Sequence, residues 1–124
     1  MRETVYWTWF IISGIALFCL VGLHMAIMHL DGLLGIFNPA GPSSVAWENV
    51  GFRNTSLFFA VTYIIMLAAA LYHGFYGLRT ILFELGPKKS FQRPITIFFW
   101  IIGICLFMFG SIAAIAAKAV DIML

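Results

Sequence analysis

Residues 54–78 read NTSLFFAVTYIIMLAAALYHGFYGL, and this stretch contains no Asp, Glu, Lys or Arg. An apolar segment of roughly 20 residues is long enough to cross the hydrocarbon core of a bilayer as a helix. A helix also pairs its backbone N–H and C=O groups internally, as the bilayer interior requires. The stretch therefore predicts a membrane-spanning α-helix.

Two further stretches without these charged residue types lie on either side of it, at residues 4–30 and 94–117. The first lacks the basic leader and the small-residue cleavage site of a secretory signal, so we expect it to belong to the mature protein. Together the stretches predict an all-α membrane protein with three transmembrane helices. The expected helices cover approximately residues 5–30, 56–85 and 94–120.

Very little of the chain lies outside these helices. The 124 residues therefore predict one membrane-anchor domain over residues 1–124, with no room for a soluble catalytic domain. Any reaction has to be shared with partner subunits or a cofactor. The connection at residues 31–53 is rich in Gly, Pro and Ser, which predicts an irregular loop. Gly86 and Pro87 are expected to end the second helix.

The basic residues are distributed unevenly between the two sides of the predicted bundle. Only Arg53 and Lys118 fall on the side away from the N-terminus. By the positive-inside rule, this bias predicts a multi-pass protein of the cell inner (plasma) membrane with a cytoplasmic N-terminus. The net charge of +2 is then a topology signal and does not indicate nucleic-acid binding. The basic residues on the N-terminal side are Arg2, Arg79, Lys88, Lys89 and Arg93.

Two histidines, His24 and His73, fall inside predicted helices. An ionisable side chain in hydrocarbon is costly and indicates a functional site, and neutral imidazole is a common metal ligand. Each histidine comes late in its helix, and the two helices run in opposite directions. At about 1.5 Å rise per residue, the two side chains differ in depth by roughly 15 Å. One haem iron cannot bind both, because its two axial nitrogens lie about 4 Å apart.

If both histidines bind haem iron, they bind two different haems, and each haem needs a second ligand from another chain. The sequence has no CxxCH motif for covalent attachment, so the expected cofactor is low-spin bis-histidine haem b, shared with a partner chain in a larger helical bundle. His29 is the alternative ligand on the first helix, about 140° around it from His24. Small residues beside His73, such as Gly74 and Gly77, suit either a macrocycle or plain helix packing.

The residues around His73 carry a family resemblance. The run His73-Gly-Phe-Tyr-Gly77-Leu-Arg79, followed by Glu84, resembles the second-helix signature of succinate dehydrogenase membrane anchors. That signature is a histidine, a glycine four residues on and an arginine two residues later, with an acidic residue near the helix end. The length and the three expected helices are similar to those anchors as well.

The first helix carries a second part of the resemblance. Ser13-Gly14, with His24 ten residues after the glycine, resembles the first helix of anchors that carry two haems. The chain is thus similar to the membrane anchor (cytochrome b) subunits of succinate dehydrogenase and fumarate reductase, of the two-anchor, two-haem type.

The resemblance implies a haem b-binding anchor subunit of succinate:quinone oxidoreductase. Such a subunit is itself non-catalytic and passes electrons from an iron–sulfur subunit toward membrane quinone, the substrate. The resemblance also implies two b haems, with His73 the iron ligand of the haem nearer the cytoplasm and His24 that of the outer one. The implied partners are a second membrane anchor, an iron–sulfur subunit, a flavoprotein subunit and membrane lipid.

The sequence departs from the family pattern at two positions. Many anchors have an arginine that serves quinone binding two residues before the Ser-Gly pair, where this chain has Ile11. A tyrosine that often follows the acidic residue is here Leu85. Ser13 and Arg79 are then the candidates on this chain for contacts with quinone or a haem propionate. Arg79 also has a simpler interpretation, an arginine that extends from a helix end to water.

Two other interpretations remain open from the sequence. One is a haem-free anchor of the same complex class, whose histidines only pack and form hydrogen bonds. The other is a small structural or transport subunit without a redox role. The second is disfavoured because the predicted spans carry no acidic residue for coupling to protons or cations.

Overall fold

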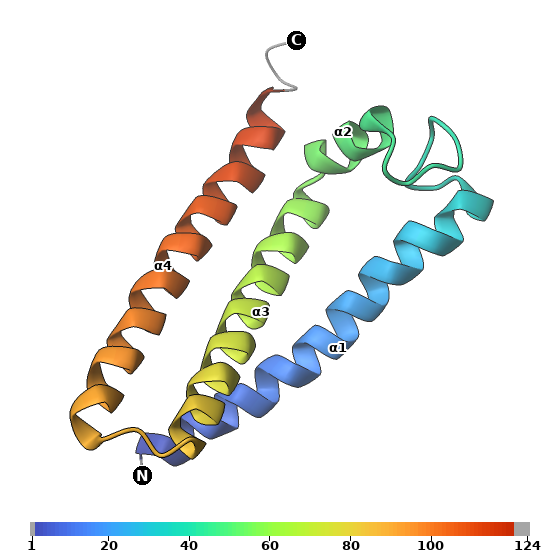
Figure 1. The fold of residues 1–124 in the computed structure, drawn as a ribbon. Coiled ribbons are helices and arrows are strands. Elements are labelled where there is room, and N and C mark those ends of the chain that lie inside the picture. The colour runs from blue at the N-terminus through green and yellow to red at the C-terminus, as the bar shows by residue number, and fades with distance from the viewer. Residues whose placement is uncertain (1, 121–124) are drawn as a thin grey trace.

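The computed structural model describes residues 2–120, and these form α-helices and connecting loops without a strand. In order, the helices are α1 (Arg2–Leu34), α2 (Trp47–Thr55), α3 (Leu57–Glu84) and α4 (Lys89–Val120) (Figure 1). Three of them, α1, α3 and α4, are long and apolar enough to cross a membrane. The predicted all-α fold with three membrane-spanning helices is therefore confirmed.

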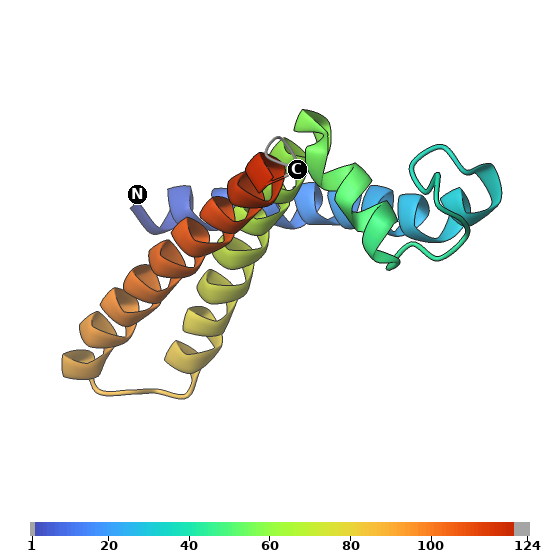
Figure 2. The same cartoon turned by 90° about the horizontal axis from the view of Figure 1, so that it is seen from above.

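Helix α3 lies between the other two long helices. It packs against α1 on one side and against α4 on the other, whereas α1 and α4 do not pack against each other in the described residues. Figure 1 shows the N-terminus and the α3–α4 connection at one end of the bundle, which we call the N-terminal end. The short helix α2 lies at the opposite end, which we call the loop end. From above, α1 runs across the α3–α4 pair (Figure 2).

Few side chains are enclosed by this arrangement. Phe59 and Ala60 are the buried apolar residues of the described chain, and no described residue of α4 is buried. Large apolar side chains such as Phe18, Phe109 and Ile112 are well exposed along the long helices. Lipid tails are as apolar as these side chains, so a membrane protein can leave them uncovered. The helices are thus arranged to contact lipid and other chains.

The end of α3 follows from its sequence. Helix α3 stops at Glu84, and Gly86 has a φ of +72°. That left-handed conformation costs little for glycine and is common just after a helix. The Gly86 N–H bonds the Phe83 carbonyl at 3.1 Å. The prediction that Gly86 and Pro87 end the second helix is confirmed.

The predicted start of the last helix was wrong by more than a turn. Helix α4 begins at Lys89, not near residue 94, and Pro94 lies inside it. The charge-free stretch marks only the part suited to hydrocarbon, whereas a helix can continue past the membrane surface with basic residues. For the same reason α1 starts at Arg2 and continues to Leu34, beyond the expected residues 5–30.

The connection at the loop end is more regular than predicted. Residues 31–53 were expected to form an irregular loop, but residues from Trp47 onward form α2. The Gly and Pro residues of this connection precede position 44, apart from Gly51, which lies inside α2. After them, Glu48 in the first turn and Arg53 in the last turn of α2 suit the helix dipole.

Asn49 ties α2 to the preceding loop. Its side chain is fully buried, at 0% exposure. The Asn49 Oδ1 accepts the Ala40 N–H at 2.9 Å, and Nδ2 donates to the carbonyls of Gly41 and Ser43 at 3.0 and 2.8 Å. A buried amide with all these partners is stabilising, whereas an unpaired one is costly.

Arg53 makes the second tie in the same loop. Its side chain is only 2% exposed, and its guanidinium donates to Asn38 Oδ1 and to the Ser44 carbonyl. The planar guanidinium can reach two acceptors at once, which an ammonium group cannot do with the same geometry. The loop before α2 is therefore organised by the polar side chains of Asn49 and Arg53.

Candidate functional site

His73 lies at the contact between α1 and α3, near the N-terminal end. Its ring is stacked on Phe10 of α1, with ring centroids 4.2 Å apart and planes 4° from parallel. Its Nδ1 is 3.0 Å from the Phe10 carbonyl oxygen. Two contacts with one α1 residue therefore fix both the position and the rotation of the imidazole.

The hydrogen bonds around Phe10 also determine the tautomer of His73. The Ser13 hydroxyl donates to the same Phe10 carbonyl at 2.8 Å, and Ser13 is buried at 8% exposure. A carbonyl oxygen can only accept, so the Nδ1 of His73 has to carry the proton. The Nε2 of a neutral His73 then carries a lone pair that can bind a metal.

The imidazole fits against α1 because residue 14 is glycine. A methyl group at Gly14 would lie 2.9 Å from His73 Cε1 and 3.2 Å from Nδ1, closer than packed atoms normally approach. Gly77 on α3 similarly leaves room for the Phe10 ring of α1, since a methyl group there would lie 3.3 Å from a Phe10 ring carbon. Gly22 and Gly74, in contrast, have no such neighbour within 4 Å.

His24 lies at the same α1–α3 contact but nearer the loop end. Its ring meets Tyr63 edge to face, with centroids 5.8 Å apart and planes at 76°. His24 makes no hydrogen bond with another described residue, so this chain does not select its tautomer. It lines a shallow hollow with Leu23, Ile27, Phe58, Phe59, Thr62, Tyr63 and Met66. His29, the alternative ligand, is exposed.

The contact partners separate the two histidines along α3. Tyr63, which touches His24, precedes His73 by ten residues, or about 15 Å of helix. One iron cannot bridge that distance, since its two axial nitrogens lie about 4 Å apart. Within the described residues, no three His, Cys, Asp or Glu side chains are grouped to hold a metal ion. His24 and His73 therefore cannot bind the same iron, and neither belongs to such a group.

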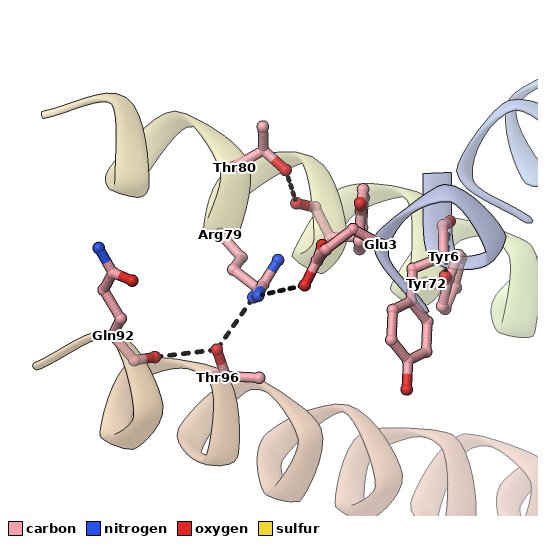
Figure 3. Close-up of polar contacts among 8 residues, drawn as sticks. Glu3, Tyr6, Tyr72, Arg79, Thr80, Gln92 and Thr96 are labelled. Carbon is pink, nitrogen blue, oxygen red and sulfur yellow. Dashed lines mark hydrogen bonds and ion pairs between the residues drawn. The ribbon is translucent and has the colours of Figure 1, made fainter. Parts of the chain in front are cut away.

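Ser13 and His73 both contact the Phe10 carbonyl, whereas Arg79 contacts a different set of residues. Arg79 Nε donates to Thr96 Oγ1 of α4 at 2.9 Å, and Nη2 lies 3.5 Å from a Glu3 carboxylate oxygen of α1 (Figure 3). The guanidinium also covers the Phe83 ring at 4.3 Å. Arg79 therefore links all three long helices at the N-terminal end and does not contact the pair of Ser13 and His73.

A cleft between α3 and α4 was missed by sequence reasoning. It has a volume of about 320 Å³, and half of its lining residues are aromatic, with Arg79 and Thr96 at one end. The α3 and α4 residues that line it recur every three or four positions, which is the signal that could have revealed it. The lining residues are Ala68, Leu71, Tyr72, Phe75, Tyr76, Arg79, Thr96, Phe99, Trp100, Gly103, Ile104 and Phe107.

Residues 2–113 match the protein family described as succinate dehydrogenase/fumarate reductase transmembrane subunit. The chain belongs to this family. It is a membrane anchor subunit with several apolar helices, and the succinate dehydrogenase/fumarate reductase complex supplies its partner subunits. Comparisons with curated proteins and with solved structures find no matching protein.

In this anchor subunit, polar side chains contact one another at the N-terminal end of the membrane-spanning helices. The Tyr72 hydroxyl donates to the Tyr6 carbonyl at 2.9 Å, next to the Glu3–Arg79 pair (Figure 3). These contacts join α1 to α3 on one side of Arg79, and Thr96 joins α4 on the other. Polar side chains thus connect the three long helices at this end, whereas His24 contacts α3 through the ring of Tyr63.

Proposed function

We propose that this anchor subunit binds haem b through Nε2 of His73. The observation that carries the proposal is the hydrogen bond between His73 Nδ1 and the Phe10 carbonyl at 3.0 Å. Histidines that bind metals nearly always donate their other ring N–H to a carbonyl or a carboxylate, which fixes the tautomer and makes the ligand nitrogen more basic. Ser13 supports this arrangement, because its hydroxyl donates a second hydrogen bond to the same Phe10 carbonyl oxygen.

We infer a second haem b with His24 as its iron ligand, nearer the loop end. The separation of the two histidines along α3 supports two haems over one. Because this chain offers one ligand at each depth, a second anchor subunit completes each bis-histidine pair. Bound haem supplies reversible one-electron transfer. The residues of this chain hold and orient it, and Phe10 and Gly14 fix the ring of His73.

In the assembled complex, we propose, electrons pass from an iron–sulfur subunit to membrane quinone. A flavoprotein subunit oxidises succinate, and the anchor lies in the inner (plasma) membrane with its N-terminus in the cytoplasm. The exposed Lys88, Lys89 and Arg93 at the N-terminal end support this orientation. Arg79 follows His73 by six residues, about 9 Å along α3, and is our candidate for a haem propionate; Ser13 is the candidate for quinone.

Absorbance and electron paramagnetic resonance spectra of the purified complex test the haem assignment. His73→Ala is expected to remove one low-spin haem and His24→Ala the other, because each variant removes an axial ligand. His29→Ala is the matched control and is expected to leave both haems in place. A full haem complement in the double variant of His24 and His73 would contradict the proposal.

A haem-free anchor is the second candidate, and one observation favours it. The contacts of His73 with Phe10 already join α1 to α3 without any cofactor. In that case the purified wild-type complex has no Soret band, and His73→Ala lowers the thermal stability of the complex without any spectral change. The wild-type spectrum therefore decides between the two candidates.

A further inference from the structure

Neither candidate haem ligand lines the cleft between α3 and α4, although Arg79, our candidate for a haem propionate, stands at its polar end. Both histidines lie at the contact between α1 and α3, whereas the cleft lies on the α4 side of α3. It opens sideways, since Trp100 and Ile104 on its wall are 51% and 56% exposed. A cavity of about 320 Å³ thus opens at the side of an apolar bundle, on a surface suited to contact lipid.

The chemistry of the cleft changes along its length. Toward the loop end it is lined by apolar side chains, from Ala68 on α3 to Phe107 on α4. At the N-terminal end the lining becomes polar, where Arg79 bonds Thr96. A ligand that fits this gradient has a long apolar part and a polar group at one end.

The α4 wall of the cleft continues into basic residues. Lys89 and Arg93 precede Thr96 and Trp100 at spacings of four, three and four residues, which places all four on one face of the helix. Lys89 and Arg93 are both exposed. The polar end of the cleft therefore opens onto a short basic stripe, defined here as Lys89 and Arg93.

The charges at this end favour an anionic ligand. Of the described acidic residues, Glu3 already pairs with Arg79 at 3.5 Å, and Glu84 is exposed at the end of α3. Lys88, Lys89 and Arg93 outnumber them. An uncharged amphiphile, such as a quinone, makes no use of the basic stripe, whereas a phosphate group is recognised by it.

We propose that the α3–α4 cleft binds an acidic phospholipid, with an acyl chain between the aromatic side chains and the phosphate on the basic stripe. Basic pockets between membrane helices are known to bind such headgroups. The aromatic walls contributed by Phe75 and Phe99 bury the chain. The proposal does not depend on haem, because the basic stripe, Phe75 and Phe99 take no part in the proposed haem sites.

Native mass spectrometry of the whole complex, stripped of lipid in neutral detergent, tests the proposal. Phosphatidylglycerol is expected to bind more tightly than phosphatidylcholine. The double variant Lys89→Gln, Arg93→Gln is expected to lose about thirtyfold in affinity for phosphatidylglycerol, since each cation is removed from an anionic headgroup. Lys118→Gln, near the other end of α4, is the control and is expected to bind like the wild type.

A second pair of variants tests the acyl-chain part of the site. Ala68→Phe fills the cleft and is expected to lower the affinity for both phospholipids by about tenfold. Ala116→Phe, at an exposed α4 position outside the cleft, is expected to leave binding unchanged. These variants keep the basic stripe, so they remain informative if the double Gln variant fails to assemble.

Three results would overturn the proposal. One is equal affinity for both phospholipids, and another is equal binding by Ala68→Phe and Ala116→Phe. The third is displacement of phosphatidylglycerol by a quinone in a one-to-one ratio, which would make the cleft a quinone site. Haem absorbance is recorded in every sample and is expected to be the same in all variants, so failure of the haem proposal and failure of this one are distinguishable.

Discussion

At the scale of single residues, Gly14 decides whether the imidazole of His73 can lie against α1. Gly14→Ala adds a methyl group 2.9 Å from Cε1, so the ring has to move and its bond to Phe10 is lost. We expect a loss of about 1–3 kcal/mol in stability and a changed low-spin haem signal. Gly22→Ala on the same helix, with an open Cβ position, is the control for thermal unfolding and spectra. Identical effects of the two variants would contradict this role.

Arg53 is a second residue on which a local structure depends. Arg53→Ala leaves Asn38 without the guanidinium partner of its Oδ1, in a site where both residues are 2% exposed. We expect a cost of about 1–3 kcal/mol, because a buried acceptor loses its donor. The measurement is the rate of proteolysis of the loop before α2 in detergent, with Lys118→Ala as control. Arg53→Lys is expected to restore little of the lost stability, because an ammonium group cannot reach both acceptors.

At the scale of the helices, apolar runs without charge were enough to predict α1, α3 and α4, because burial in lipid depends on composition. They could not give the helix bounds, since a helix continues past the membrane surface with charged residues, as α4 does from Lys89. Helix α2 could not be predicted from the sequence pattern, because it depends on hydrogen bonds between Asn49 and a separate loop. The sequence pattern also could not predict that Ser13 and His73 share the Phe10 carbonyl, because this depends on how α1 packs against α3.

The end of α3 allows a prediction about an element. Gly86→Ala places a methyl group on a residue with φ of +72°, which costs about 1–2 kcal/mol for an L-residue. We expect a lower midpoint of thermal unfolding and no change in bound haem. Gly86→Asn is expected to cost less, because asparagine tolerates this conformation. Gly51→Ala, inside α2 with no atom near its Cβ position, serves as the control and is expected to be neutral or slightly stabilising.

At the scale of the whole molecule, the three long helices leave many large apolar side chains exposed, and the two candidate haem ligands lie at different depths. His73 and His24 cannot complete each other's iron coordination across about 15 Å of α3. The isolated polypeptide in detergent is therefore expected to bind haem weakly or with a high-spin spectrum, and co-expression with a second anchor subunit is expected to restore the low-spin form. The measurement is haem content and spectrum of each preparation at equal protein concentration. A monomer of this chain with a normal bis-histidine spectrum would refute the two-anchor arrangement, and His29→Ala in that monomer would then show whether His29 supplies the second ligand.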